Sequence, residues 1–414
     1  MPKIVTLGLH QNLRPLMGNI TLFSQIIKKI DRSIFKKLVQ EKQTDKGCKG
    51  FDSWTHLVSM LFCHFAKSTS VRDISNGLRS ATGNLNHLGI SKAPSKSSIS
   101  YQNKRRDSDL FKELYYSLLK HLGQQASLRR VKLRIKAPVY LLDSTVVSLC
   151  LSVFDWATFR TKKGAVKMHT LLDYDGKLPV YVNITEGSVA DNKGAYDIPL
   201  EKGSVIVADR YYNDFPMLNV WDSKGVYFVI RHKDNLAFKT VNERELPEKG
   251  AQHVLKDEEI ELTNTQSKIK YPGRLRRVAV WDEENEQTIE LITNNFAWSA
   301  QTIGDLYKSR WEIEVFFRDI KQLLHIKTFI GTSKNAVMIQ IWTALITILL
   351  LKVMKATAKF GWHLSNLVAF IRLNIFVKIE LQKWLDRPFE DHDKPPQKSP
   401  QGDLFPDYFQ KARL

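Results

Sequence analysis

Four residues near the C-terminal end of the chain bring together a carboxylate, two cations and a phenol. They are Tyr307, Arg310, Glu314 and Lys321, within the stretch LYKSRWEIEVFFRDIKQLLH. On one α-helix, at about 100° of rotation per residue, the four fall within an arc of roughly 60°. The apolar residues of the same stretch gather on another side and would pack inward. Such a face could hold a metal ion beside a phosphodiester, or Arg310 and Glu314 could simply form an exposed ion pair.

Two aspartates belong to apolar runs that predict strands. Asp143 lies inside APVYLLDSTVVSL, and Asp209 follows the short run VIVA in GSVIVADRYYND. Taken alone, Asp209 is better explained as a helix N-cap than as a catalytic residue. A carboxylate inside an apolar strand, as at Asp143, instead needs a partner or a cation. Together with Glu314, the two aspartates would offer oxygen ligands for Mg²⁺, or Mn²⁺. Two such ions, about 4 Å apart, could stabilise both oxygens of an in-line phosphoryl displacement.

Strands and helices must position these acids. Runs of β-branched and apolar residues predict five core strands, at 139–149, 166–172, 178–184, 205–208 and 226–231. The polar stretch that follows alternates in short runs and predicts a β-rich insertion before the helix of Glu314. An apolar stretch at 336–354 predicts a buried helix packed on the sheet, although its length also permits a membrane span.

Charge distinguishes the N-terminal region from the rest of the chain. The protein has 62 Lys and Arg against 43 Asp and Glu, a net charge of +19. Residues 1–136 hold 25 of the cations and 8 of the acids, so almost all of the excess lies there. This distribution predicts a phosphate-binding module attached to a nearly neutral one.

The basic region contains a candidate helix-turn-helix. SVRDISNGLRS predicts a helix capped by Ser70, and SKSSISYQNKRRD predicts a second helix capped by Ser95 or Ser97. The second helix would enter the major groove of double-stranded DNA. The alternative is a basic helix end that only complements the helix dipole. The predicted DNA contacts are Lys96, Ser98 and Asn103 to bases, with Lys104, Arg105 and Arg106 ending the helix.

Other features of the sequence narrow the class of protein. Three cysteines without metal-ligand or disulfide spacing predict a cytoplasmic location, and the N-terminal residues lack a signal-peptide core. No Gly-rich phosphate loop occurs, so no nucleotide cofactor is expected. Asp191 is predicted to cap a helix, and His169 to be packed or hydrogen-bonded on the second strand.

At this point the motifs resemble a known family. The spacing Y-x2-R-x3-E-x6-K resembles the signature of DDE transposases of the insertion-sequence-four family. LLDST around Asp143 and ADRYYND around Asp209 are similar to the motifs of that family's two catalytic aspartates. The segment from FSQIIKKIDRSIFKKLV to SSISYQNKRRD is similar to the helical domain that precedes the catalytic core in one branch. The resemblance spans most of residues 20–355.

The resemblance implies an α/β fold with a ribonuclease-H-like catalytic core, a mixed sheet with flanking helices and a β-rich insertion. An all-helical DNA-binding domain would precede it. Asp143, Asp209 and Glu314 would bind two Mg²⁺ or Mn²⁺ ions and carry the catalysis, while Tyr307, Arg310 and Lys321 would bind DNA phosphates. Members of the family can hold a flipped base on an aromatic side chain of the insertion, for which Trp281 is the candidate, with a hydrophobic anchor as the alternative. The expected divisions are residues 1–136 for the helical domain, 137–231 and 295–385 for the core, 232–294 for the insertion and 386–414 for a flexible tail.

The implied activity is cut-and-paste transposition. Members of the family nick the ends of their element, form and reopen a DNA hairpin, and join the 3′ end to target DNA. The expected partners are the terminal inverted repeats, target DNA and a second copy of the chain in a synaptic complex, with no membrane. Two alternatives remain open from the sequence. One is a structure-specific nuclease that cuts without joining, and the other is a catalytically silent DNA-binding regulator.

Overall fold

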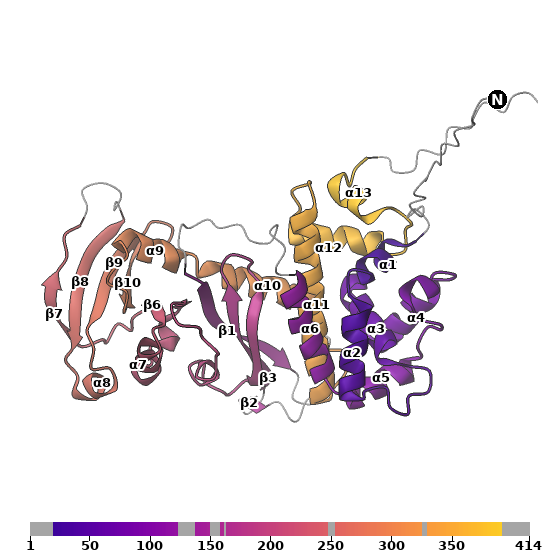
Figure 1. The fold of residues 1–414 in the computed structure, drawn as a ribbon, viewed down its shortest axis with the longest axis horizontal. Helices are drawn as coiled ribbons and strands as arrows, with labels where there is room; N and C mark the ends of the chain where they lie inside the picture. The colour runs from indigo at the N-terminus through magenta and orange to yellow at the C-terminus, as the bar shows by residue number, and fades with distance from the viewer. Residues whose placement is uncertain are drawn as a thin grey trace, which may run out of the picture.

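The computed structural model describes residues 20–122, 137–149, 158–160, 163–246, 253–324 and 329–390. The molecule is elongated, with a large sheet at one end and most of the helices at the other (Figure 1). The predictions for Cys150 and for the tail beyond residue 390 lie outside the described residues.

The core sheet contains the five predicted strands. They are β1 (Val139–Leu149), β3 (Lys163–Asp173), β4 (Pro179–Glu186), β5 (Val205–Ala208) and β6 (Tyr227–Arg231), with the short β2 (Thr158–Arg160) beside β3. The strands β1, β3 and β4 form an antiparallel meander, while β5 and β6 run parallel to β1. The predicted α/β class with a mixed sheet is therefore confirmed.

The predicted insertion is β-rich, and it extends the core sheet rather than standing apart from it. Its strands are β7 (Phe238–Glu243), β8 (Val254–Leu262), β9 (Leu275–Asp282) and β10 (Gln287–Thr293), with the short helix α8 (Thr265–Lys270). β10 pairs antiparallel with β6, giving one ten-stranded sheet in the order β2-β3-β1-β5-β6-β10-β9-β8-β7, with β4 on β3. This pairing covers the edge that β6 would otherwise expose.

Every element described before β1 is helical. These are α1 (Leu22–Ile27), α2 (Arg32–Lys42), α3 (Ser53–Ala66), α4 (Val71–Ser80), the 3₁₀ turn η2 (Asn86–Leu88), α5 (Lys96–Arg105) and α6 (Asp109–Leu122). After β4 come the 3₁₀ turns η4 (Lys193–Ala195) and η5 (Arg210–Tyr212), then α7 (Phe215–Ser223). The C-terminal helices are α9 (Ala300–Lys308), α10 (Trp311–Leu324), α11 (Lys334–Thr357), α12 (Leu364–Leu373) and α13 (Leu381–Asp386).

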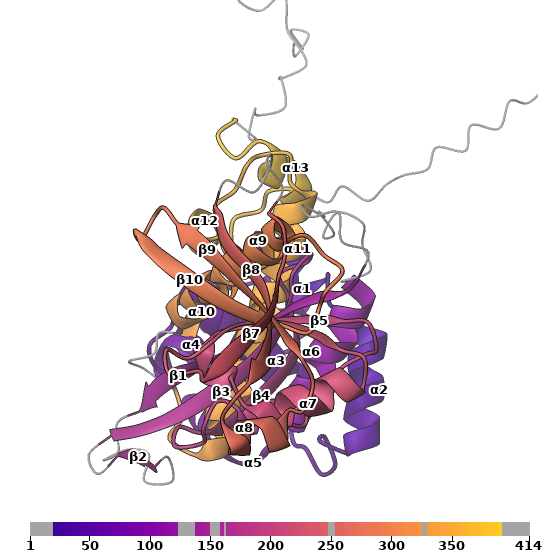
Figure 2. The same cartoon turned by 90° about the vertical axis from the view of Figure 1, so that its left-hand side faces the viewer.

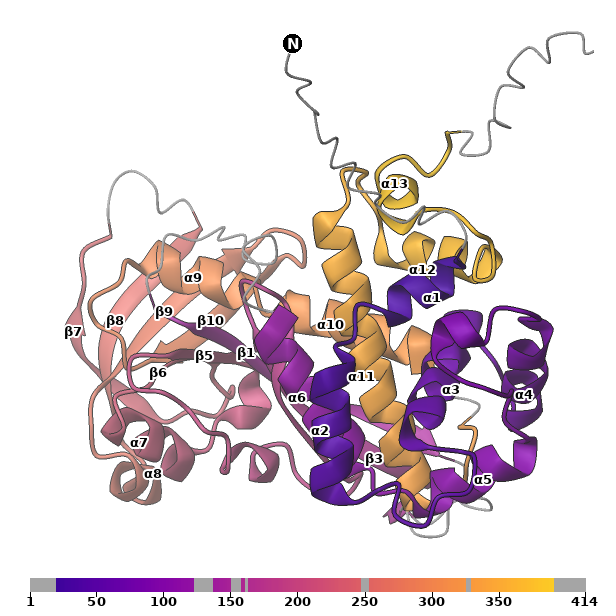
Figure 3. The same cartoon turned by 45° about the vertical axis from the view of Figure 1, so that its right-hand side comes forward.

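The apolar helix α11 lies between the sheet and the N-terminal helices (Figure 3). It is long and apolar enough to cross a membrane, but 89% of its most apolar 18-residue stretch is buried inside the fold. Its neighbours are helices of both regions, α3, α5, α6, α10 and α12. The prediction of a buried helix is confirmed, but α11 packs among helices instead of on the sheet. Its central position places the N-terminal helices and the core strands in one continuous hydrophobic core.

The sheet separates two hydrophobic cores. Leu141 of β1 belongs to the core shared with α10 and α11, whereas its neighbour Leu142 belongs to the core under α7. Figures 1 and 2 show α9 on one side of the strands and α7 with α8 on the other. Because successive strand residues point to opposite faces, this division decides which side of the sheet each later residue of β1 faces.

Candidate functional site

Asp143 and Asp209 lie side by side where the parallel pairing of β1 with β5 stops. The register of β1 and β5 pairs Leu142 with Ala208, and the two aspartates follow directly, Asp143 within β1 and Asp209 just after the end of β5. Ligand sites of α/β sheets form beyond the carboxyl ends of parallel strands, which is where Asp209 lies. Asp209 also caps η5, because its Oδ1 accepts a hydrogen bond of 2.9 Å from the backbone N–H of Tyr211.

The stretch from Tyr307 to Lys321 is two helices, not the single helix expected from its sequence. α9 ends before Ser309 and α10 begins after Arg310. At the junction, the N–H of Arg310 bonds to the carbonyl three residues back, and the Ser309 hydroxyl bonds to the carbonyl of Leu306 at 2.5 Å. These bonds tighten the chain into a 3₁₀-type turn. Tyr307 therefore lies on α9, Arg310 in the turn, and Glu314 and Lys321 on α10.

Arg310 brings the acids of sheet and helix together. Its Nη2 lies 2.6 Å from Oε1 of Glu314, and its Nη1 lies 3.8 Å from Oδ2 of Asp143. The guanidinium is only 20% exposed, and Asp143 is 17% exposed. The pair of Arg310 and Glu314, which the sequence also allowed to be exposed, is thus half-buried. Through Asp143, the same arginine links α10 to β1. Tyr307 lies against the same guanidinium, whose centre is 5.9 Å from the ring centroid.

Burial and like charge act together on the pKa of Asp143. The pKa is raised to about 7, mainly by burial, then by the charge of Asp209 and less by that of Glu314, while the Ser144 hydrogen bond and Arg310 oppose the rise. Burial also raises the pKa of Asp209, with Tyr211 and Arg310 opposing. Three carboxyl groups from distant parts of the chain therefore share one electrostatic environment, which favours a bound cation.

A cleft of about 530 Å³ opens beside these acids, between β1 and α10. Asp143, Glu314 and Lys321 line it. Arg318 and Gln322, also on α10, extend the same wall. Burial lowers the pKa of Lys321, and the nearby Asp143 carboxylate opposes that shift. The cleft is thus lined by acids and cations together, as a phosphodiester site requires.

Within the described part of the chain, no three acidic, histidine or cysteine side chains lie close enough together to hold a metal ion. The Arg310 guanidinium fills the space between Asp143 and Glu314 and neutralises them in the place of a cation. The donors themselves suit Mg²⁺ or Mn²⁺, because all three are carboxylates and two of them are raised in pKa by burial.

Three polar residues beside the acids have roles that the sequence did not reveal fully. Asn192, and not Asp191, caps η4, so the prediction of a cap at Asp191 is wrong. Asp191 instead accepts hydrogen bonds from Ser144 and Lys167. The expected hydrogen-bonded histidine is confirmed, since Nε2 of His169 lies 3.0 Å from the hydroxyl of Thr185. No periodicity in the loop after β4 could have revealed Asp191.

The candidate recognition helix α5 is correct as an element, but two of its predicted contacts are wrong. Asn103 is 2% exposed and bonds to His56 at 2.7 Å, while Arg106 is 4% exposed and donates to the carbonyls of Asp52 and Phe51. Both side chains are thus used inside the helical region. They are buried because α5 packs against α3, α4 and α11. The basic composition of the segment gives no sign of this packing.

The exposed side of α5 carries the remaining candidates. Lys96, Lys104 and Arg105 are exposed, and Ser98 is half-buried at the N-terminus, where Ser95 is the cap. Tyr101, which the sequence did not single out, is 55% exposed and stacks under Arg105, with 5.0 Å from its ring centroid to the guanidinium. α5 therefore presents three cations and an aromatic ring to solvent.

The buried His56 predicts a dependence of stability on pH. Burial, then the charge of Arg106, lowers its pKa from 6.5 to about 3, against the opposing bond to Asn103. Between pH 6.5 and 3, His56 therefore binds a proton in the unfolded chain but not in the folded chain. The free energy of unfolding falls as the pH drops through this range. We expect His56→Gln, which keeps a donor for Asn103, to reduce this loss by up to about 1.4 kcal/mol per pH unit. Urea unfolding at pH 7, 6 and 5 measures it, and parallel curves for both proteins would refute it.

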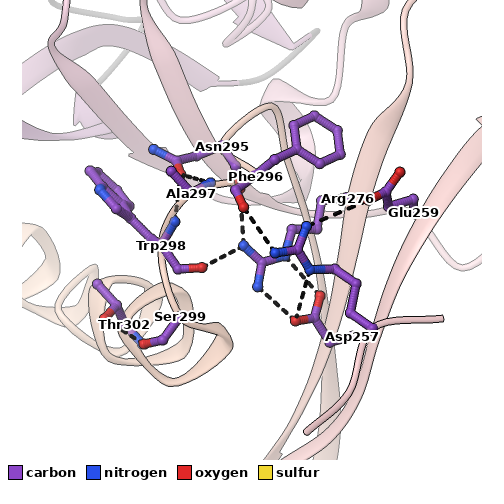
Figure 4. A network of polar contacts seen from close by, with 10 residues as sticks. Asp257, Glu259, Arg276, Asn295, Phe296, Ala297, Trp298, Ser299 and Thr302 are labelled. Carbon is purple, nitrogen blue, oxygen red and sulfur yellow. Dashed lines mark hydrogen bonds and ion pairs between the residues drawn. The ribbon is translucent and has the colours of Figure 1, made fainter. Parts of the chain in front are cut away.

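A buried arginine fixes the loop that leads into α9 (Figure 4). Arg276 of β9 is 1% exposed and forms two bonds of 2.7 Å to Asp257 of β8. Its Nη1 also donates to the backbone carbonyls of Asn295 and Trp298, at 3.2 and 2.6 Å. The insertion strands thus hold the start of α9, on which Tyr307 lies.

Loss of this arginine should destabilise the protein measurably. Arg276→Met leaves the Asp257 carboxylate buried, with Arg244 as a weaker partner at 3.6 Å. We expect the free energy of unfolding to fall by about 2–3 kcal/mol. The control is Arg274→Met, whose side chain is 55% exposed in its ion pairs and should change the stability by less than about 1 kcal/mol. Equal effects of the two substitutions in chemical denaturation would contradict a role for the buried network.

The candidate base-binding residue Trp281 lies near the end of β9. Its side chain is 41% exposed, and its backbone N–H bonds to the carbonyl of His253 at 2.7 Å. This exposure disfavours the alternative of a hydrophobic anchor. Contact of Trp281 with a flipped base stays a prediction.

A family model and the curated relatives that match this chain describe transposases. The family model of the transposase DDE domain matches residues 134–350, and a domain of unknown function matches residues 18–91. The chain is 29% identical over 277 residues to a probable transposase for insertion sequence element IS5377 of Geobacillus stearothermophilus, covering 67% of this chain and 72% of the relative. It is 32% identical over 263 residues to the putative transposase y4zB of Sinorhizobium fredii, covering 63% and 72%. A cryo-EM structure of the piggyBac transposase synaptic complex with hairpin DNA aligns with a TM-score of 0.39 at 10% identity, over 89% of this chain and 80% of that one.

Proposed function

Since this chain belongs to the family of transposases with a DDE domain, we propose that it binds the ends of its insertion sequence and catalyses metal-dependent cleavage and joining of DNA. It is an enzyme of the DDE transposase kind. Asp143, Asp209 and Glu314 are the proposed acids, with hairpin formation and strand transfer as the proposed steps. The observation that carries the assignment is the convergence of these acids, from β1, β5 and α10, around Arg310.

The proposed cofactor is a pair of Mg²⁺ or Mn²⁺ ions held by the three acids. Such ions would supply stabilisation of the negative charge that develops on the attacking and leaving oxygens. Arg310 would then release Glu314 and contact a DNA phosphate, while Tyr307 and Lys321 would hold the neighbouring phosphates. The raised pKa of the half-buried Asp143, about 7, supports a site that needs a cation for its ionised form.

The type of catalytic core, the branch of the family, the oligomeric state and the DNA substrates are also proposals. The order β4-β3-β1-β5-β6, with β5 and β6 parallel to β1, supports a ribonuclease-H-like core. The spacing of Tyr307, Arg310, Glu314 and Lys321 supports the insertion-sequence-four branch. A homodimer bridged by two element ends would form the synaptic complex. Double-stranded terminal repeats and target DNA are the proposed substrates.

Incubation of the protein with Mg²⁺ and a labelled duplex carrying an element end tests the proposal. We expect nicked, hairpin and strand-transfer products on denaturing gels, and none with a chelator. Cleavage without any joined product would favour the structure-specific nuclease. Binding without cleavage would favour the silent regulator and refute the catalytic proposal.

The exposed face of α5 is the proposed contact of the helical region with DNA. We expect the double substitution Lys104→Ala and Arg105→Ala to weaken binding and to lower the slope of log affinity against log salt by about two. Replacing two exposed cations of α2, Lys36→Ala and Lys37→Ala, is the matched control. Fluorescence anisotropy at several salt concentrations measures both. Equal slopes for the two double variants would contradict a role specific to α5.

A further inference from the structure

A second polar cluster lies behind Asp143, on the opposite face of the sheet. Leu141 faces the core of α10, so Asp143, two residues later on the strand, faces the same way. Ser144 faces the other side, together with Leu142. The Ser144 hydroxyl donates a hydrogen bond of 2.5 Å to Oδ1 of Asp191. Ser144, which borders the cleft next to Asp143, is thus anchored through its side chain on the opposite face of the sheet.

One oxygen of Asp191 serves two donors. Besides the Ser144 hydroxyl, Oδ1 accepts a bond of 2.9 Å from the ammonium of Lys167 on β3. Lys167 is 9% exposed and the side chain of Asp191 is 26% exposed, so this ion pair is partly shielded from water. The ammonium balances the charge of Asp191, which lies close enough to Asp209 to contribute to the raised pKa of that aspartate, after burial as the main cause.

The hydrogen bond between Ser144 and Asp191 lies where β1 is no longer paired with β5. β1 pairs with β5 only as far as Leu142, because the chain after Ala208 turns away into η5. From Asp143 onward, β1 keeps its backbone partner on the β3 side, where Asp143 faces Thr170. The contact from Ser144 to Asp191 therefore ties the unpaired side of β1 to the connection between β4 and β5.

The connection that bears Asp191 is itself seated closely on β3. A Cβ atom at Gly194 would lie 2.4 Å from the ring of His169, so only glycine permits this approach. Asn192, next to Asp191, donates a bond of 2.6 Å to the Asp214 carboxylate at the start of α7. The close packing of Gly194 on His169 and the hydrogen bond from Asn192 to Asp214 hold the loop at two points, so Asp191 is kept in a fixed position.

We propose that Ser144, Asp191 and Lys167 form a positioning unit that holds the Asp143 carboxylate in the orientation needed to bind a cation. The backbone N–H of Ser144 donates to Oδ1 of Asp143 at 2.7 Å, so a shift of Ser144 moves that carboxylate. The three act through Asp143 and from the far face of the sheet, and are positioning residues rather than catalytic ones. This inference rests on the proposed function of Asp143.

Ser144→Ala is the decisive variant, because it removes the hydroxyl and leaves the ion pair of Asp191 and Lys167 intact. We expect Mn²⁺ binding, measured by calorimetry on the full chain, to weaken about tenfold. The single-turnover cleavage rate at saturating DNA should fall by a similar factor, while DNA affinity stays unchanged. Ser144→Thr, which restores a hydroxyl, should recover both. Ser148→Ala, at an exposed position of the same strand and face, is the matched control and should behave as wild type.

A double-substitution cycle tests the link to Asp191. Asp191→Ala should weaken Mn²⁺ binding at least as much as Ser144→Ala, and the double variant should be no weaker than Asp191→Ala alone. Asp197→Ala, at an exposed position of the same connection, is the control. Wild-type Mn²⁺ affinity in Ser144→Ala, additive losses in the cycle, or a parallel loss of DNA affinity would overturn the inference. Absence of cleavage by the wild-type protein would instead refute the proposed function.

Discussion

Asp143→Asn is expected to reduce Mg²⁺-dependent cleavage of element-end DNA by about 10³-fold or more, roughly 4 kcal/mol of transition-state stabilisation. Asparagine has the same shape and can still accept the hydrogen bond from Ser144, but it removes the charge at the centre of the acid cluster. Single-turnover cleavage at saturating DNA and Mg²⁺ measures the change. Strand transfer from a pre-nicked end should fall in the same way, because both steps would use the same acids.

Two controls show whether the loss of cleavage in Asp143→Asn comes from the chemical step rather than from DNA binding or folding. DNA affinity of Asp143→Asn should match that of wild type, and its thermal stability should not decrease, because asparagine can keep the Ser144 hydrogen bond, Arg310 keeps Glu314 as a partner, and the substitution removes a charge that burial disfavours. Asp175→Asn, in the turn after β3, removes a half-buried acid outside the acid cluster and should leave the cleavage rate unchanged. Wild-type cleavage by Asp143→Asn would remove the basis of the catalytic assignment.

Arg310→Met is expected to have two opposite effects. Cleavage should fall by about 10²- to 10³-fold, because the guanidinium no longer stabilises charge at the reacting phosphate. Binding of Mn²⁺ without DNA should become about tenfold tighter, because the guanidinium that now lies 2.6 Å from Glu314 competes with the ion for the same carboxylates. Calorimetry or paramagnetic resonance of Mn²⁺ measures the second effect independently of activity. The salt dependence of DNA binding should also decrease by about one ion.

The control for Arg310 lines the same cleft. Arg318 is exposed on α10 and bears the same charge. Arg318→Met should leave Mn²⁺ affinity unchanged, because this guanidinium does not lie between the acids. Unchanged or weaker Mn²⁺ binding in Arg310→Met would indicate that Arg310 does not compete with the cation. In that case its role would be confined to DNA contact or to the packing of α10.

Much of the fold was predictable because its signals are local. β1 and β5 were predicted from apolar runs with the observed bounds, and the caps Ser70 and Ser95 from short polar motifs. The break between α9 and α10 was missed, because the apolar period continues across it. It depends on hydrogen bonds of Ser309 and Arg310 that a helical wheel does not represent. The burial of Asn103 was missed because it depends on His56, 47 residues away.

By itself, the sequence determined the identity and order of the candidate acids and the strands and helices that present them, since these follow from residue type and periodicity. Only the tertiary structure decided what surrounds the acids. It placed Arg310 between Asp143 and Glu314. It also brought Asp191 and Lys167 behind Ser144 and continued the insertion as part of the core sheet. These contacts join segments far apart in the chain, and their free energy depends on distance, burial and charge in the folded protein, which no local pattern encodes.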